Sequence, residues 1–225
     1  MKIGIVLPSL PAYSETFFRN KILGLQKNGH QVVLFVNNSE NCNSYLNCKV
    51  VIAPKLSGNK IKVLIITFQQ LILSGINFSR SWKLFKLNKQ YKLSLLQNIK
   101  QIVSNQFLMN EKLDWLHFGF GTMAIGRENV AEAIQTKMAV SFRGFDYYVY
   151  PLKNKDCYKT LFEKEVKYHV LSEAMKKGLM EKLISKDKIF KITPAIDIKL
   201  FDYKINEQLN KKIHFTTISR LHYIK

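Results

Sequence analysis

The chain of 225 residues carries a formal net charge of +19, from 35 lysines and arginines against 16 aspartates and glutamates. This length accommodates one full domain and somewhat more, but it excludes two complete domains of ordinary size. The charge favours anionic partners, namely nucleic acid, anionic lipid headgroups or phosphorylated substrates, and does not choose among them.

Three cysteines, Cys42, Cys48 and Cys157, form no C-x-x-C pair and leave one over in any pairing. They indicate neither a disulfide framework nor a zinc site, and they are typical of a protein kept in a reducing cytosol. We therefore expect no metal and no structural disulfide.

Neither of the two apolar runs has the form of an export or membrane signal. The run before Pro8 has only about seven apolar positions, which is too few for a signal-peptide core and predicts a strand instead. The most apolar stretch, residues 63–78, is interrupted by Gln69 and Gln70 and falls short of the roughly 18 to 20 residues that a spanning helix needs. We expect no transmembrane segment.

Strand and helix patterns alternate along the first forty residues. Residues 2–8 form a short apolar run, Ser14 is the expected N-cap of a helix that lasts until Gly29, and residues 30–38 form a β-branched run. This β-α-β order, with continuous apolar strands, is typical of a parallel sheet covered on both faces.

The alternation continues along the chain and ends in a strand that stands apart. The expected strands are 49–53, 114–119, 137–144, 168–172, 188–193 and 212–219, and the expected helices include 122–135 and 173–183. We interpret the polar residues 202–212 as a linker between domains. The prediction is an α/β fold with a Rossmann-like parallel sheet in a domain of residues 1–201, followed by the first strand of a second domain in residues 213–225.

The middle of the chain is basic and contains no acid. Residues 41–110 hold ten lysines or arginines and not one aspartate or glutamate. Apolar side chains recur among these lysines at nearly helical spacing: Trp82, Phe85, Leu87, Tyr91, Leu95, Leu96 and Ile99. Two interpretations stay open, a helix pair with a solvated lysine face and a basic amphipathic surface that lies on an anionic membrane.

The loop after the first strand is the first candidate binding site. Open α/β sheets bind ligands at the carboxyl ends of their strands, and this loop places Ser14, Glu15 and Thr16 at a helix N-terminus. No G-x-G-x-x-G motif is present, so a dinucleotide fingerprint is absent. The alternative is a helix start that binds nothing.

A histidine and two glycines follow a later strand. His117 lies near the strand end, and Gly119 and Gly121 follow, where the lack of a side chain lets a substrate approach the backbone. His117 is the candidate catalytic residue, with a purely structural role as the alternative.

A third cluster of polar residues follows the strand 137–144. Arg143, Gly144 and Asp146 come directly after the apolar run. Arg143 can pair with Asp146 in a structural role, or it can bind an anionic group at the sheet edge.

Five segments in order resemble GT4-type glycosyltransferases of the GT-B fold, closest to members that build bacterial exopolysaccharide, capsule or lipopolysaccharide. They are "PSLPAYSETFFRNKILGLQKNGHQVVLFV", "DWLHFGFG", "SFRGFD", "HVLSEAMKKGLMEKLISKDKIFKITPAIDIKLF" and "TTISRLHYIK". The resemblance implies two Rossmann-like domains, with the acceptor bound on the N-terminal one and a nucleotide-diphosphate sugar mainly on the C-terminal one.

The resemblance also implies roles for two residues near the end of the sequence. The family holds the donor diphosphate with an arginine and a lysine five residues apart, and Arg220 and Lys225 match that spacing. Two fixed cations would neutralise the charge that grows on the leaving group as the glycosidic bond breaks. No metal or other cofactor is expected.

The sequence departs from the family pattern in several places. Gly119 and Arg143 stand where many relatives have histidines, and Pro194-Ala195 replaces the usual Asn-Gly. The family's E-x7-E pair has no counterpart, because it belongs deep in the donor domain. We therefore expect the 225 residues to comprise an acceptor domain and the first strand of a donor domain, inactive or nearly so by themselves.

The leading hypothesis is retaining transfer of a sugar to a lipid-linked or polysaccharide acceptor. By the resemblance, the reaction would occur in a bacterial cytoplasm, at the inner face of the membrane. The alternative is a basic module that binds a membrane or an acceptor without catalysis. Nucleic acid is not expected as a partner, since only the net charge favours it.

Overall fold

The structure is a computed structural model that describes residues 1–12, 15–38, 44–194, 215 and 217. The chain divides into two units, Met1–Pro194 and Ala195–Lys225. All helices and strands that the structure describes lie in the first unit. The predicted domain end at 201, the linker 202–212, and all but two residues of the last predicted strand lie outside the described residues, so those boundaries stay predictions.

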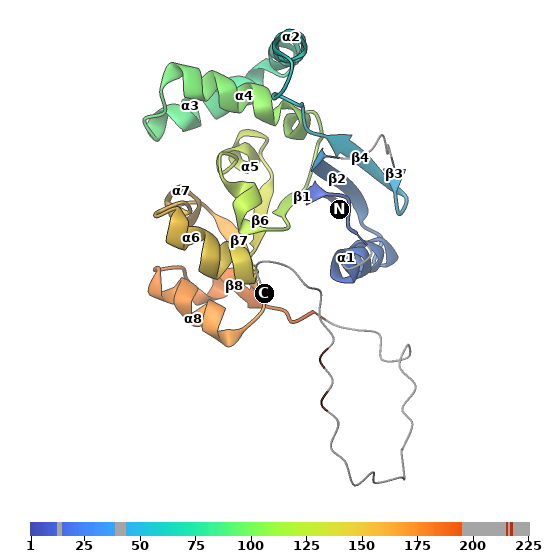
Figure 1. Cartoon of the computed structure of the whole chain (residues 1–225), viewed down its shortest axis with the longest axis vertical. Helices are drawn as coiled ribbons and strands as arrows, with labels where there is room; N and C mark the ends of the chain where they lie inside the picture. Colours follow the sequence, from blue (N-terminus) through green and yellow to red (C-terminus); the bar gives the residue numbers. More distant parts are fainter. Residues whose placement is uncertain (13–14, 39–43, 195–214, 216, 218–225) are drawn as a thin grey trace. The chain divides into compact units, whose positions relative to one another are not determined.

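One sheet runs through the first unit, as Figure 1 shows. Its strands are β1 Lys2–Ser9, β2 Gln31–Asn38, β3 Ser44–Tyr45, β4 Cys48–Ile52, β5 Trp115–Phe118, β6 Lys137–Ser141, β7 Val166–Val170 and β8 Ile189–Lys191. The spatial order is β3-β4-β2-β1-β5-β6-β7-β8, and every pair is parallel except β3 with β4. The predicted Rossmann-like parallel sheet is confirmed for the seven strands that the sequence indicated up to residue 193; the short antiparallel β3 was not predicted.

Helices connect the strands and cover the sheet. They are α1 Thr16–Lys27, α2 Lys60–Ile76, α3 Phe78–Gln90, α4 Leu95–Met109, α5 Val130–Ala133, α6 Tyr150–Lys153, α7 Lys159–Phe162 and α8 Glu173–Glu181. Single turns of other helix types lie at Gly121–Ala124, Phe145–Val149 and Lys186–Lys188.

Side chains alternate between two apolar clusters, one on each face of the sheet. On β1, Ile3, Ile5 and Leu7 pack with Phe18 and Ile22 of α1 in one cluster. The larger cluster, on the other face, joins alternate residues of β1, β2, β5, β6 and β7 to side chains of α3, α4, α5, α7 and α8. Because successive side chains of a strand point to opposite faces, a strand buried on both sides must be continuously apolar, as β1 and β2 are.

The helix predicted over residues 122–135 was wrong. A short turn, Gly121–Ala124, is followed by further turns over residues 125–129, and helix returns only in α5, Val130–Ala133. Gly126 has a φ of +73°, a left-handed conformation that interrupts a right-handed helix. The apolar periodicity was real, since Met123, Ala124, Val130 and Ala131 are all buried, but two turns joined by a loop satisfy it.

The predicted amphipathic stripe of residues 82–99 is divided between two helices. Lys92, with a φ of +57°, separates α3 from α4. Leu87 is buried against the core, whereas Leu95 and Leu96 are exposed, so the seven side chains do not share one face. No single helix in the described part of the chain is long and apolar enough to span a membrane; α2 and α3 together meet the criteria of length and composition, with a bend of 103° between them.

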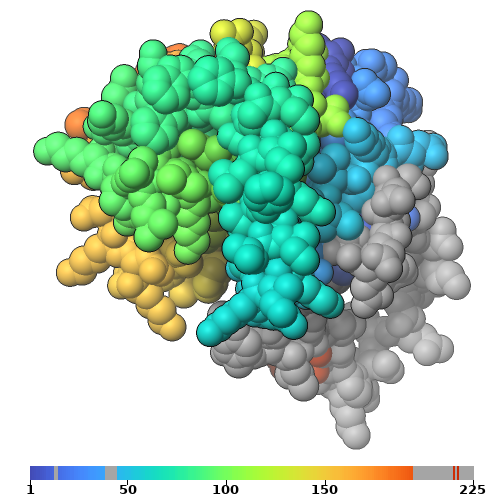
Figure 2. All heavy atoms as spheres, turned by 90° about the horizontal axis from the view of Figure 1, so that it is seen from above, coloured from blue at the N-terminus to red at the C-terminus, as the bar shows by residue number. Residues whose placement is uncertain are grey.

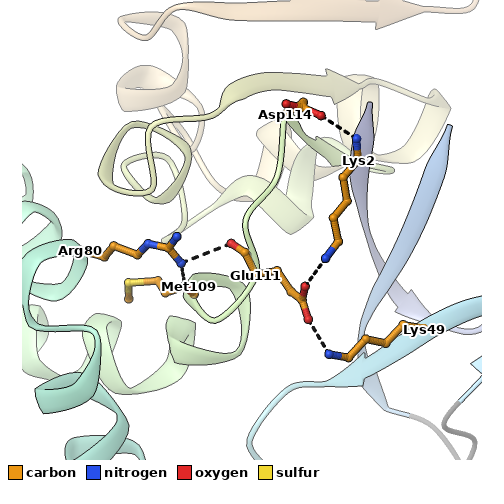
Figure 3. Close-up of polar contacts among 6 residues, drawn as sticks. All are labelled: Lys2, Lys49, Arg80, Met109, Glu111 and Asp114. Carbon is orange, nitrogen blue, oxygen red and sulfur yellow. Dashed lines mark hydrogen bonds and ion pairs between the residues drawn. The ribbon is translucent and has the colours of Figure 1, made fainter.

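A buried glutamate ties the amino end of the sheet to the helical layer (Figure 3). Glu111 follows α4, and its carboxylate accepts hydrogen bonds from Lys2 of β1 and Lys49 of β4, each at 2.6 Å. Arg80 of α3 donates to the backbone carbonyl of Met109 in the same turn. Burial by itself would raise the pKa of Glu111, but the two lysines outweigh it and lower that pKa below its ordinary value.

Replacing Glu111 with glutamine should lower the free energy of unfolding by about 1 to 3 kcal/mol, because Lys2 then loses a charged partner in a mostly buried position. Lys49→Met is the matched control, and it should cost less than about 1 kcal/mol because the Lys49 side chain is 63% exposed. Urea denaturation measures the free energy of unfolding of both variants. Equal decreases in the two would contradict a stabilising role of Glu111 beyond its contact with Lys49.

Candidate functional site

Three loops far apart in sequence meet at the carboxyl edge of the sheet. They follow β1, β5 and β6, whose parallel pairing places their ends at one edge. The guanidinium carbon of Arg143, after β6, lies 3.8 Å from the ring centre of Phe17 in α1, and Lys21 of α1 reaches His117 of β5. The sequence-predicted groups around Glu15, His117 and Arg143 are therefore neighbours in space.

A chain of hydrogen bonds crosses three strands on the face that α1 covers. Lys21 Nζ lies 3.1 Å from His117 Nδ1 and 3.2 Å from Nε2, and His117 Nε2 lies 2.8 Å from Ser141 Oγ at the end of β6. Ser141 Oγ is 2.9 Å from His169 Nδ1 in β7, and His169 Nε2 is 2.8 Å from the carbonyl oxygen of Ile192.

The last acceptor fixes the direction of this chain. A carbonyl oxygen only accepts, so His169 donates from Nε2 and accepts at Nδ1 from the Ser141 hydroxyl. Ser141 then accepts from His117 Nε2, which leaves His117 Nδ1 to accept from the Lys21 ammonium. With both imidazoles neutral, the N–H or O–H of His117, Ser141 and His169 each has an acceptor.

The electrostatics of the site support neutral histidines. Burial, together with the charges of Lys21 and Arg143, lowers the pKa of His117 well below its ordinary value and lowers the pKa of His169 as well. Burial and the charge of Arg143 lower the pKa of Lys21 to about 8. Because both ring nitrogens of His117 are occupied, the geometry favours the structural alternative for this residue, and its catalytic role stays a prediction.

The Arg143 guanidinium is held by aromatic rings. Its Cζ lies 3.8 Å from the ring centre of Phe17, 4.9 Å from that of Phe18 and 5.6 Å from that of Phe120. Stacking on ring faces stabilises a cation without using its N–H donors. Among the described residues, Arg143 Nε is buried without a hydrogen-bond partner, and the guanidinium makes no ion pair.

Asp146 shapes the loop and does not pair directly with Arg143, contrary to one of the two predictions. Its Oδ1 accepts from the backbone N–H of Arg143 at 2.7 Å, and its Oδ2 accepts from the backbone N–H of Gly121 at 2.6 Å. Burial raises the pKa of Asp146 to about 6, against the lowering effect of these bonds. The carboxylate thus joins the loops after β5 and β6.

Packing explains two of the glycines at this edge. A Cβ at Gly119 would lie 2.4 Å from Leu7 Cδ2 and 2.8 Å from the Phe18 ring, and one at Gly121 would lie 2.4 Å from the Phe142 ring. Core side chains, and not a substrate, fill the space that these glycines leave. Gly144, by contrast, is exposed with nothing within 4 Å of its Cβ position. Acceptor binding at Gly119 and Gly144 stays a prediction.

Several predicted site residues have limited or no description. Ser14, Arg220 and Lys225 lie outside the described residues. Thr16 is the first residue of α1 and is exposed. Glu15 takes the N-cap position that was predicted for Ser14, without a side-chain cap, and its carboxylate accepts from the backbone N–H of Ala12 at 3.1 Å.

Three residues of the site, which hydrogen bonds connect to His117, were not predicted from the sequence. Lys21, Ser141 and His169 complete the chain around His117. Ser141 and His169 alternate with apolar neighbours in their strands, a pattern that signals one polar face but not what that face contacts. Lys21 is one lysine among many, and no sequence signal distinguishes it.

A separate pocket of about 410 Å³ lies at the opposite edge of the sheet. Its lining includes Trp115, Lys137 and Val166, the first residues of β5, β6 and β7. None of the predicted site residues belongs to this lining. Within the described residues, no group of three or more histidine, cysteine or acidic side chains could hold a metal ion. The expectation of a metal-free site stays a prediction.

The chain resembles known proteins in structure, without a match by sequence. No family model matches the chain, and no curated protein matches it by sequence. One similar structure is the lipopolysaccharide outer core galactosyltransferase WaaB in its apo form, with 12% identity, a TM-score of 0.49, and coverage of 88% of this chain and 47% of WaaB. Another is the UDP-GlcNAc 2-epimerase from Methanocaldococcus jannaschii, with 16% identity, a TM-score of 0.43, and coverage of 85% and 45%. The chain thus spans about half the length of each.

The neutral histidines predict a loss of stability in acid. Below pH 6.5 the unfolded chain binds protons at His117 and His169 that the folded chain resists, so the free energy of unfolding should fall as the pH drops from 7 to 5. We expect a contribution of about 1 to 2 kcal/mol from His117.

His117→Gln isolates this contribution, because glutamine can accept from Lys21 and donate to Ser141 but does not titrate. Denaturant unfolding of the variant and the wild type is measured at pH 5, 6 and 7. The raised pKa of Asp146 increases stability as the pH falls, but it does so in both proteins and therefore cancels in the difference between them. Parallel pH profiles for the variant and the wild type would show that His117 is not held neutral.

Proposed function

We propose that this chain is the acceptor-side part of a GT-B glycosyltransferase that transfers a sugar from a nucleotide-diphosphate donor to a lipid-linked or polysaccharide acceptor with retention of configuration. The observation that carries the proposal is the meeting of Phe17, Lys21, His117 and Arg143 at the carboxyl edge of the sheet. These residues belong to three of the five segments that resemble the GT4 family, and open α/β sheets bind their ligands at this edge.

The residues of this edge suit binding and orientation. Arg143 offers N–H donors on a guanidinium fixed by aromatic rings, and Lys21 offers an ammonium fixed against His117. His117 and Ser141 hold that ammonium in place, and Asp146 holds the two loops together. By the family resemblance, Arg220 and Lys225 neutralise the charge of the departing diphosphate. The reaction uses no metal and no cofactor beyond the nucleotide sugar.

The enzyme test uses a protein in which this chain continues into a complete donor domain. It should release nucleoside diphosphate from a nucleotide sugar in the presence of a lipid-linked glycan, EDTA should have no effect, and NMR of the product should show the donor's anomeric configuration. Arg220→Ala should lower kcat by about 100-fold, since it removes a cation from the leaving group. Lys211→Ala, in the predicted linker, is the control and should leave kcat unchanged.

Three results would contradict the proposal. They are absence of turnover with every nucleotide sugar, loss of turnover with EDTA, and turnover by residues 1–225 alone at the rate of the longer protein.

We further propose that the protein works on an anionic membrane surface, at the inner face of a bacterial cytoplasmic membrane, and that α2 makes the contact. This helix has no buried residue, although it is the most apolar of the longer helices that the structure describes. Its outward side chains include Leu64, which is 71% exposed, Phe68, which is 64% exposed, and Ile76, which is 75% exposed. In Figure 2, α2 (teal) lies at the surface beside α3 and α4, with no other described element over it.

The charge around α2 supports a lipid partner. The stretch 41–110 contains no acidic residue, and Lys60 and Lys62 begin the helix. Next to it, Trp82 is stacked between Phe78 and Phe85, is 47% exposed and has the Lys86 ammonium over its ring. Apolar side chains rimmed by lysine, with tryptophan at the boundary, are typical of segments that lie in an anionic interface. This observation also supports the alternative function, a membrane-binding module without catalysis.

Vesicle co-sedimentation tests the membrane contact. Residues 1–225 should bind vesicles that contain phosphatidylglycerol and bind phosphatidylcholine vesicles much more weakly, and 0.5 M salt should weaken the binding. The double variant Leu64→Gln, Phe68→Gln should lower the partition coefficient at least tenfold, because each side chain contributes about 1.5 to 3 kcal/mol when buried.

The matched control is Leu152→Gln with Leu183→Gln, two leucines outside the acid-free stretch that are 79% and 94% exposed. The membrane proposal fails if both double variants bind vesicles alike. It also fails if light scattering shows a dimer that the α2 variant alone dissociates, since a second copy would then cover the helix.

A further inference from the structure

The two cations at the carboxyl edge have no anionic partner within the described part of the chain. Neither Lys21 nor Arg143 takes part in an ion pair there. Burial lowers the pKa of both side chains, and the charge of Arg143 lowers that of Lys21 further. Removing like charges from water and placing them near each other is unfavourable unless a counter-charge is present.

The nearby acidic groups are engaged elsewhere. Both carboxylate oxygens of Asp146 accept backbone N–H groups, from Gly121 and Arg143. The charges of Asp146 and Glu15 act on Arg143, but neither carboxylate hydrogen bonds to its guanidinium, and that of Glu15 accepts from the backbone of Ala12. The side-chain donors of Arg143 are therefore free among these groups, and Nε is buried without a partner.

The surroundings hold the two cations in place without an ion pair to either among the described residues. Phe17 and Phe18 fix the plane of the guanidinium, and the hydrogen-bond chain through His117, Ser141 and His169 fixes the ammonium. A preorganised planar fork beside a point charge matches the geometry of a phosphate or a carboxylate.

We infer that Lys21 and Arg143 form a binding site for an oxyanion, either a phosphate or a carboxylate, carried by the acceptor. That an oxyanion binds here rests on the geometry of the two cations; that the acceptor carries it rests on the proposed function. The acceptor class is then an acidic or phosphorylated glycan, and not a neutral one.

The binding test uses residues 1–225 and needs no sugar transfer. Inorganic phosphate, glucuronate and glucose are titrated separately while NMR follows the ring C–H signals of His117, which contacts Lys21, and of His169, which Ser141 links to His117. Phosphate or glucuronate should give saturable shifts and glucose none. A preference for phosphate identifies a phosphorylated ligand, and a preference for glucuronate identifies an acidic sugar.

Variants assign the binding to the two cations. Lys21→Gln keeps a donor to His117 but removes the charge, and Arg143→Gln removes the fork; each should weaken anion binding at least tenfold. Lys27→Gln, at the exposed end of the same helix, should change nothing, which separates a built site from the general effect of the +19 charge. Arg143→Lys serves if Arg143→Gln does not fold, and it should bind more weakly than the wild type.

The inference is overturned if neither anion gives saturable shifts, if both cation variants bind as the wild type does, or if Lys27→Gln loses as much affinity as they do. Failure of nucleotide-sugar turnover with intact anion binding would overturn the proposed enzyme function and leave the oxyanion site standing.

Discussion

The parallel register of β1, β5 and β6 is the constraint on which the candidate site depends. Because these strands run in the same direction, the residues that follow them, or lie near their ends, must meet at one edge of the sheet. The carboxyl ends then bring His117, Ser141 and Arg143 together, while the amino ends are tied by Glu111 to Lys2 and Lys49. The amino edge therefore carries an ion-pair network around Glu111, and the carboxyl edge has two cations without an ion-pair partner among the described residues.

This separation of charge explains how a protein of high positive charge can be selective. Most of its lysines are solvated on the surface and attract any anion weakly. Lys21 and Arg143 differ, since both are desolvated and neither forms an ion pair with a described residue. A fixed, partly buried cation discriminates among ligands by geometry, whereas an exposed one responds mainly to ionic strength.

The helical layer over the larger cluster has two surfaces of different character. Its inner surface, from α3, α4 and α5, packs against the sheet through buried residues such as Leu84, Phe107 and Val130. Its outer surface includes α2, which has no buried residue. An apolar helix that its own domain does not bury increases the exposed apolar area, and a lipid surface would remove that area from water.

The sequence by itself determined the seven parallel strands and their order along the chain, because continuous apolar runs and turn residues are local signals. It also located His117 and Arg143 at strand ends, where parallel sheets bind ligands. It did not predict the break at Gly126, since the apolar period continues across it.

Only the tertiary structure decided which partners those residues have. Lys21 and His117 lie 96 positions apart, and their contact depends on how α1 packs on the sheet. The same holds for α2, whose composition resembles that of a buried helix and whose exposure follows from the packing of α3 and α4 beneath it. Long-range packing sets these contacts, and no local pattern in a single sequence encodes it.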